Sequence, residues 1–148
     1  MAAAAQADGI SLTLVVGYQD ADTRQAAYEA RVQTYRDKRK SEEEAARLAA
    51  TIQPAANANE HGTGYAADIL SADDPQQNTS FAETRAYEWL TAYAAEYGFI
   101  LRYPQDRQTA TGIVFEPWHW RYVGVENALA IRASGLSLEE FIALQRAD

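Results

Sequence analysis

The chain has 148 residues, with 13 Lys and Arg, 21 Asp and Glu, two His and no Cys, and its formal net charge is −8. This length suits a single domain over residues 1–148. The lack of Cys excludes a disulfide scaffold, a Cys-ligated zinc finger and a cysteine nucleophile. The acidic balance argues against nucleic acid as a partner, and no apolar run is long enough for a transmembrane helix. With two imidazoles in all, any metal site must also recruit carboxylates.

Residues 1–8 open with an alanine run that lacks the basic residues and the apolar stretch of a signal peptide. We interpret them as a native helix start or, alternatively, as a disordered or artificially added segment. The chain is then expected to be one domain of a longer exported or anchored protein.

The segment that follows predicts one strand and two helices. Ser11–Val16 is rich in β-formers and predicts a strand that ends at a glycine. After Asp20, the residues Tyr28, Val32 and Tyr35 recur at helical spacing and predict a helix. The pattern breaks at Asp37–Lys40. Ser41 with Glu44 predicts a capping box and a second helix ending near position 50.

The middle of the chain changes from irregular to regular. Ile52–Gly64 is rich in Pro, Asn and Gly and predicts a loop, and Tyr65–Leu70 predicts a buried strand. Ser80 with Glu83 predicts another capping box. The helix after it ends at Gly98. It has one apolar face, formed by Ala82, Ala86, Trp89, Leu90, Tyr93 and Tyr97.

The last third of the chain predicts the remaining strands and two short helices. Phe99–Arg102, Ile113–Phe115 and Trp120–Val123 have the composition of strands. Gly135 separates the two helices, and Ser137–Glu140 predicts a third capping box. The element order therefore indicates an α+β domain with a small sheet flanked by helices.

Both histidines have carboxylates near them in the sequence. His61 precedes Asp68 by seven residues, and Asp68 lies within a strand that otherwise reads as buried. A buried carboxylate is costly unless it is paired, hydrogen-bonded or bound to a metal. Glu116 precedes His119 by three residues, and Pro117 between them disfavours a regular helix. Glu116 and His119 are therefore expected to project from a strand or a turn.

These residue types suit a catalytic zinc ion. Such sites use three His, Asp or Glu ligands and keep one position open for water. His61, Asp68 and His119 are the candidate ligands, which leaves Glu116 as the candidate general base. In the alternative interpretation His61 caps a loop and His119 stacks among aromatic residues, and that interpretation leaves Asp68 and Glu116 unexplained.

Two motifs in the same order resemble those of the VanY-like D-alanyl-D-alanine carboxypeptidases. The first is His61-x-x-Gly-x-x-x-Asp68, and the second is the run from Glu116 to Gly124, EPWHWRYVG. The run from Tyr97 to Pro104, the dipeptide Thr111–Gly112 and the segment Ser137–Phe141 also match family patterns. The resemblance extends from about residue 9 to the end of the chain. The wider group contains L,D-carboxypeptidases, peptidoglycan endolysins and the hedgehog fold.

The resemblance implies a fold, a metal and a reaction. The fold would be a small, mainly antiparallel sheet of the hedgehog and D-Ala-D-Ala peptidase type. His61, Asp68 and His119 would hold one Zn²⁺ per chain, and Glu116 would take a proton from the zinc-bound water. The substrate would be the peptide bond before a C-terminal D-amino acid in a peptidoglycan stem peptide or precursor. The protein would act as a monomer in the cell envelope or outside the cell.

The chain departs from the family at positions that contact substrate. The family usually has Ser-Gly-Tyr-Arg after its first strand, where this chain ends in Gln19, and Ser two residues before the first ligand, where it has Asn59. Gln19 donates a hydrogen bond but carries no charge, and Arg24 is a candidate replacement for the missing cation. The candidate substrate-binding residues are therefore Gln19, Arg24, Asn59 and Trp118. These departures indicate altered specificity more than lost catalysis.

Several alternatives stay open. The specificity is D,D-carboxypeptidase, L,D-carboxypeptidase or endopeptidase, or the chain is a zinc-containing module that binds cell-wall peptides with little activity. Trp118 lines a cleft or packs in the core, whereas Trp120 is expected in the core. Tyr65 lines the cleft or packs beside Asp68. The basic residues of the first long helix are expected to be a solvated face, with an anionic cell-wall polymer as the alternative: Arg31, Arg36, Lys38, Arg39 and Lys40.

Overall fold

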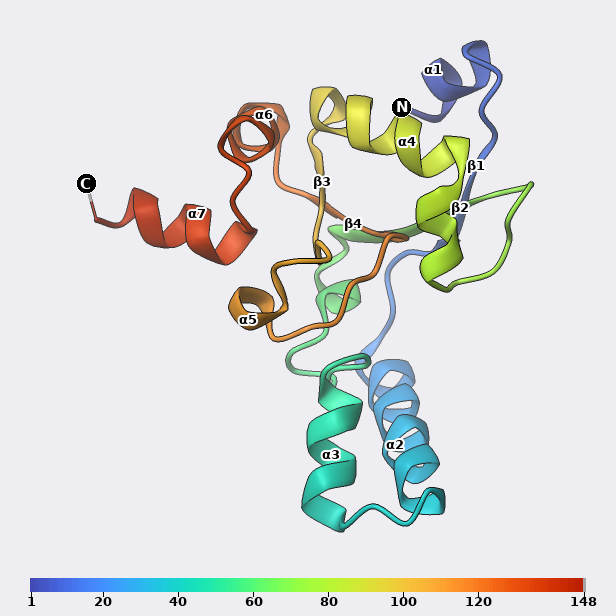
Figure 1. Cartoon of the computed structure of the whole chain (residues 1–148), viewed down its shortest axis with the longest axis vertical. Coiled ribbons are helices and arrows are strands. Elements are labelled where there is room, and N and C mark those ends of the chain that lie inside the picture. Colours follow the sequence, from blue (N-terminus) through green and yellow to red (C-terminus); the bar gives the residue numbers. More distant parts are fainter. Residues whose placement is uncertain (148) are drawn as a thin grey trace.

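The computed structural model describes residues 1–147 and forms one four-stranded sheet with helices around it (Figure 1). All three strand pairings are antiparallel. In sheet order the strands are β1 (Leu12–Val16), β2 (Ala66–Ser71), β4 (His119–Tyr122) and β3 (Phe99–Leu101). The predicted α+β class with a small antiparallel sheet is therefore confirmed.

The α-helices are α1 (Ala2–Ala7), α2 (Ala21–Asp37), α3 (Glu42–Ala50), α4 (Arg85–Tyr93), α5 (Gln108–Thr111), α6 (Val125–Ser134) and α7 (Leu138–Gln145). The 3₁₀ helices are η1 (Glu60–Thr63), η2 (Thr79–Glu83) and η3 (Ala94–Tyr97). Among residues 1–147, none of these helices combines the length and the hydrophobicity needed to cross a membrane.

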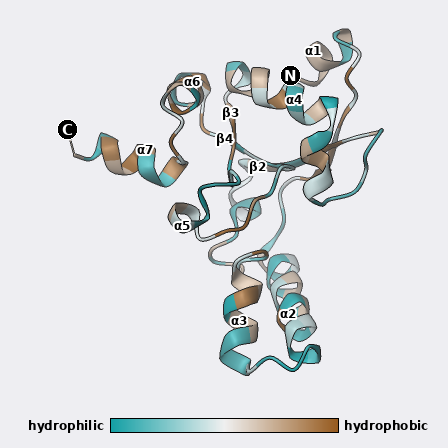
Figure 2. Cartoon of the chain, in the orientation of Figure 1, coloured by the Kyte–Doolittle hydropathy of each residue, from teal (hydrophilic) through white to brown (hydrophobic). Residues whose placement is uncertain are grey.

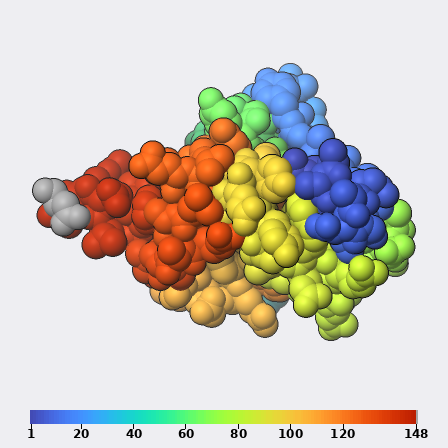
Figure 3. Space-filling model, turned by 90° about the horizontal axis from the view of Figure 1, so that it is seen from above, coloured from blue at the N-terminus to red at the C-terminus, as the bar shows by residue number. Residues whose placement is uncertain are grey.

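The main core lies between the sheet and helix α4. Trp120 of β4 is 2% exposed and packs with the buried side chains Phe81, Trp89 and Leu90. Helix α1 closes this core, since Ala5 is fully buried and the Asp8 carboxylate accepts a hydrogen bond from Trp89 at 2.7 Å. Figure 3 shows this N-terminal segment in dark blue beside the yellow α4 region. Residues 2–7 thus form a helix that packs on this core.

Helices α2 and α3 form a hairpin that projects from the sheet on the side away from α4 (Figure 1). The hairpin has its own small core, in which Val32 packs on Ala45 and Ala49 with the rings of Tyr28 and Tyr35. The far end of the hairpin is hydrophilic (Figure 2). Its near end leads into the loop before η1, so it borders the region where His61 lies.

Two predicted features are wrong. The helix start at Ser80 is instead the short helix η2, and α4 begins after Thr84, whose hydroxyl accepts from the Tyr87 N–H at 3.1 Å. The apolar face continues into η3 and ends at Gly98, as predicted. Ile113–Phe115 is not a strand, because its Val114 N–H bonds to the carbonyl of Thr51 in the hairpin and not to a neighbouring strand.

The C-terminal capping box is confirmed and gives a stability prediction. The Glu140 N–H donates to Ser137 Oγ at 3.3 Å, and the Ser137 N–H donates to the Glu140 carboxylate at 2.8 Å. We expect Ser137→Ala to lower the free energy of unfolding by about 1 kcal/mol, because it leaves a helix N-terminal donor without its acceptor. Urea unfolding measures this loss. Ser11→Ala, at an exposed serine before β1, is the matched control and should change stability by less than about 0.5 kcal/mol.

Candidate metal centre and active-site cleft

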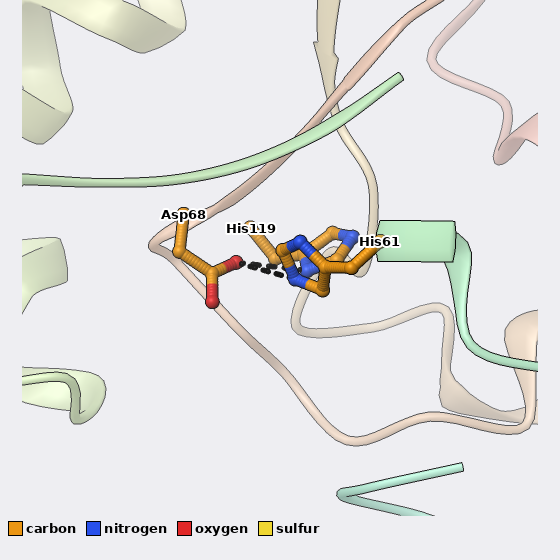
Figure 4. Close-up of side chains that lie close together, drawn as sticks. All are labelled: His61, Asp68 and His119. Atoms are coloured by element: carbon orange, nitrogen blue, oxygen red, sulfur yellow. Dashed lines mark ion pairs between the residues drawn. The ribbon is translucent and has the colours of Figure 1, made fainter. Parts of the chain in front are cut away.

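The three predicted ligands lie close together (Figure 4). Asp68 of β2 and His119 of β4 are direct partners in the antiparallel register, so their side chains emerge side by side. Trp120 points to the other face because side chains alternate along a strand. His61 comes from η1, which packs against β2. The sequence thus brings together residues 61, 68 and 119 by one strand pairing and one short helix.

The ligand atoms of the three side chains all lie within 4.8 Å of one another, and each residue is buried. Asp68 Oδ1 is 3.3 Å from His61 Nε2 and 3.0 Å from His119 Nδ1. The two imidazole rings meet nearly at right angles, with centroids 4.9 Å apart. The atoms that converge are therefore one carboxylate oxygen and one nitrogen from each ring.

The backbone around His61 holds its ring in this orientation. Asn59 caps η1, and its Oδ1 accepts from the His61 N–H at 3.0 Å. His61 Nδ1 lies 2.8 Å from the carbonyl oxygen of Gly17. A carbonyl oxygen only accepts, so Nδ1 is the donor of this hydrogen bond, and Nε2 is the ring nitrogen that faces Asp68. Metal-binding histidines are usually oriented in this way, by a hydrogen bond from the ring nitrogen that does not bind the metal.

The His119 ring also has an oxygen near the nitrogen that faces away from the site, in this case from the carboxylate of Glu60. Its Nε2 lies 3.5 Å from Oε2 of Glu60, while Nδ1 faces the site. Burial raises the pKa of Glu60, but His119 and Arg102 outweigh this and lower it to about 2. Burial lowers the pKa of His119, but Asp68 and Glu60 outweigh this and raise it to about 9. In the metal-free protein these carboxylates therefore favour the imidazolium form of His119.

The residues present fit a zinc ion. Within residues 1–147, Asp68 Oδ1 is buried and has no aligned hydrogen-bond donor, although two imidazole nitrogens lie close to it. Its other oxygen, Oδ2, is already satisfied by Gln77 Nε2 at 2.7 Å. An unsatisfied buried carboxylate oxygen between two imidazoles is expected where a cation binds. Two His and one carboxylate are also a ligand set of catalytic zinc sites.

Glu116 stands next to this centre on a tight turn. The His119 N–H donates to the Glu116 carbonyl at 3.1 Å, and buried Pro117 follows the first residue of the turn. The Glu116 carboxylate lies 3.8 Å from His119 Nδ1. Burial raises the pKa of Glu116 to about 8; Asp68 and Glu60 also raise it, whereas His119 and Arg31 lower it. Glu116 thus projects from the start of a turn and His119 from the strand that follows it, as expected.

A cleft of about 210 Å³ opens onto the centre. Besides the three ligands and Glu116, it is lined by Arg31, Ile52, Gln53, Pro54, Asn59, Glu60, Gln77, Tyr103, Ile113 and Trp118. Two predicted substrate-binding residues, Asn59 and Trp118, are in this set. Trp120 is in the core, as expected. Tyr65 is 55% exposed, stacks on Tyr122 and lies outside the cleft lining.

The other two predicted substrate-binding residues do not line the cleft among the described residues. Gln19 donates its backbone N–H to the His61 carbonyl at 3.1 Å. The Arg24 guanidinium bonds to the backbone carbonyls of Gln19 and Ala56, so it ties the start of α2 to the loop before η1. A Cβ at Gly62 would clash with the Arg24 guanidinium, so the glycine permits this contact. Arg24 therefore supports the loop of His61 and does not extend into the cleft.

Sequence reasoning missed several residues that the fold adds to the site: Arg31, Glu60, Gln77, Arg102 and Tyr103. Glu60 was signalled only by its place beside His61. Arg102 is 8% exposed, and its Nε donates to Glu60 at 2.8 Å. Its other nitrogens bond Glu139 of α7 at 2.5 and 3.0 Å. This cluster links the C-terminal helix to the carboxylate behind His119.

A comparison with protein families matches residues 1–125 to VanY, described as D-alanyl-D-alanine carboxypeptidase. A D-alanyl-D-alanine carboxypeptidase of Enterococcus faecalis is 36% identical over 139 residues, which cover 94% of this chain and 50% of that protein. The chain spans about half the length of the curated relatives it matches over most of its length.

Two solved structures are similar over nearly the whole chain. A variant of the vancomycin-resistance D,D-pentapeptidase VanY in complex with Zn(II) has a TM-score of 0.83 and 34% identity, covering 95% of this chain and 76% of that one. The L,D-carboxypeptidase LdcB, whose structure concerns peptidoglycan recognition, has a TM-score of 0.84 and 32% identity, covering 95% of this chain and 62% of that one. Together with the family match, they show that this chain belongs to the VanY D-alanyl-D-alanine carboxypeptidase family.

Proposed function

We propose that this chain is a zinc-dependent carboxypeptidase that hydrolyses the peptide bond before a C-terminal D-amino acid in peptidoglycan stem peptides. The observation that carries the proposal is the convergence of His61, Asp68 and His119 beside Glu116 at the base of a cleft. The zinc-bound VanY relative and the family description support the metal and the substrate class. Such a substrate places the activity in the cell envelope or outside the cell.

The three ligands would hold Zn²⁺ through His61 Nε2, His119 Nδ1 and Asp68. Bound zinc polarises a carbonyl and lowers the pKa of water in its open position. The hydrogen bond from His61 Nδ1 to Gly17 and the Glu60 carboxylate near His119 Nε2 fix the two rings for this role. Metal binding also requires His119 to lose its second proton, so the ligands gain a metal as they release a proton.

Glu116 would move the proton in this reaction. A carboxylate with a raised pKa is matched to general acid–base work near neutral pH. Glu116 takes a proton from the attacking water and then delivers it to the nitrogen of the departing D-amino acid. The nearby cation of a loaded site would offset part of the burial penalty and favour the ionised base. Neither histidine is free for this task, since the chain has only two and both are proposed ligands.

A panel of stem peptides tests the proposed activity. Purified zinc-loaded protein is incubated with peptides ending in D-Ala-D-Ala, D-Ala-D-Lac or a single D-Ala after L-Lys, and mass spectrometry identifies the products. We expect release of the terminal D-Ala from the first peptide. Cleavage of the third peptide alone would instead establish L,D specificity, which the similarity to LdcB favours as the second candidate. Cleavage of none would overturn the peptidase assignment for cell-wall peptides.

The metal assignment gives a separate prediction. We expect about one Zn²⁺ per chain by elemental analysis, loss of activity on chelation, and its return on addition of zinc. His61→Ala should prevent reloading, since only two of the three ligands would remain. Tyr65→Ala is the matched control, because it alters an aromatic residue near His61 that lies outside the cleft lining. Full zinc content in His61→Ala protein would show that other residues bind the metal.

A further inference from the structure

One arginine faces the cleft from helix α2. Arg31 lines the cleft together with the metal ligands and Glu116, although the residue is largely exposed to solvent. Its neighbours on the same helix lie elsewhere. Arg24 is bound to backbone carbonyls, and Arg36 pairs with Glu42 of α3. The basic residues predicted to form a solvated face are exposed to solvent, as expected, and Arg31 in addition lines the cleft.

The Arg31 guanidinium has free hydrogen-bonding capacity. Within residues 1–147 its side chain makes no hydrogen bond or ion pair, whereas Arg102 and Arg121, which also lie near the centre, contact Glu60. Among the described cleft-lining residues, Arg31 also carries the only permanent positive charge. A guanidinium presents several donors in a planar fork that matches a carboxylate.

The rest of the cleft is unfavourable for an anion. Apart from the two imidazoles, which would bind the metal, its other described charge-bearing side chains are the acids Glu60, Asp68 and Glu116. A peptide whose C-terminal carboxylate enters this cleft meets repulsion from these groups, apart from the charge of a bound metal. The chain also has Gln19 where the family usually has Arg, and Gln19 does not line the cleft. Among the described residues that line the cleft, Arg31 is the one permanent cation that can offset this repulsion.

We infer that Arg31 binds the C-terminal carboxylate of the substrate, and so makes the enzyme select peptides with a free C-terminus over amidated or internal segments. This inference rests on the proposed carboxypeptidase function and names the residue that reads the end of the peptide. Asn59 is placed to assist. Its Oδ1 is used by the His61 N–H, while its Nδ2 makes no hydrogen bond within the described residues and can donate to the same carboxylate.

The test compares two substrates that differ in charge at one group. A peptide ending in D-Ala-D-Ala is prepared as the free acid and as the C-terminal amide, and kcat/KM is measured for both with the parent and Arg31→Gln. We expect the variant to lose about 10- to 100-fold on the acid, the range of a charge-assisted pair, and to cleave the amide as the parent does. The acid-over-amide preference should thus nearly disappear.

Binding gives a readout that does not depend on turnover. In the Glu116→Gln background, calorimetry with the two peptides should show that Arg31→Gln weakens binding of the acid and leaves binding of the amide unchanged. Arg47→Gln is the matched control for charge. It removes an exposed arginine from the neighbouring helix α3 that does not line the cleft, and it should preserve the acid preference.

The outcomes separate this inference from the function on which it rests. If the parent cleaves neither peptide and binds neither, the carboxypeptidase function fails and the inference fails with it. If the parent cleaves the acid and Arg31→Gln keeps the parent's acid preference, the inference alone is overturned. An equal loss on acid and amide would also overturn it, since it would show that Arg31 acts on the metal centre or on the fold.

Discussion

Glu116→Gln is expected to lower kcat by about 10²- to 10⁴-fold on the best D-Ala-D-Ala peptide while zinc content stays at the level of the parent. The amide has nearly the shape of the carboxylate but cannot accept a proton, so the variant removes only general base catalysis. The Glu116 carboxylate is buried and lies 3.8 Å from His119 Nδ1. It is not one of the three converging ligands. Activity and metal content should therefore separate in this variant.

The measurements are steady-state kinetics and elemental analysis on the same preparation. Glu126→Gln on α6 is the matched control, because it makes the same chemical change at an exposed carboxylate outside the cleft. It should leave kcat and zinc unchanged. If Glu116→Gln kept full kcat, another group would have to carry the proton. If it lost zinc as well, Glu116 would be a ligand, and the assignment of the base would be wrong.

The convergence of the three candidate metal ligands was predictable because much of it is local. His61 and Asp68 are seven residues apart, and Glu116 and His119 share one turn. Only the pairing of β2 with β4 was needed to join the two motifs, and the structure supplies that pairing. The spacing within each motif carried most of the geometry.

The groups around the centre were not predictable in the same way. Glu60 turns toward His119 and Arg102 only because η1 packs against β2, a contact that no local pattern specifies. Arg31 and Arg36 look alike in the sequence, yet one faces the cleft and the other pairs with Glu42. Which side of a helix meets a loop depends on how the α2–α3 hairpin docks.

Errors in the predicted elements have a related cause. The composition of Ile113–Phe115 is that of a strand, but the hairpin supplies the hydrogen-bond partner of Val114, so the segment lines the cleft as an irregular stretch. Ser80 and Glu83 have the spacing of a capping box, but Thr84 caps the helix that forms. In both cases tertiary packing overrode a local preference.

Replacement of Arg102 by Met is expected to lower the free energy of unfolding by about 3–5 kcal/mol. Arg102 is 8% exposed and joins the carboxylates of Glu60 and Glu139. Glu60 is ionised, because its pKa is about 2. Without Arg102, the buried charge of Glu60 would lose the guanidinium that donates to it at 2.8 Å, and that loss costs more than the lost contacts of the side chain itself.

Urea unfolding of the metal-free protein measures the effect, with Arg107→Met as the matched control. Arg107 also lies near α7, but its side chain is 34% exposed and 3.8 Å from Glu140, so its loss should cost no more than about 1 kcal/mol. Adding Glu60→Gln to Arg102→Met removes the uncompensated charge and should recover part of the stability. The double-mutant cycle then gives a coupling energy between the two residues. Arg102→Met and Arg107→Met could instead lower the free energy of unfolding equally, with no recovery in the double variant. That result would show that the Glu60 charge does not need Arg102 and that α7 is not coupled to His119 through this cluster.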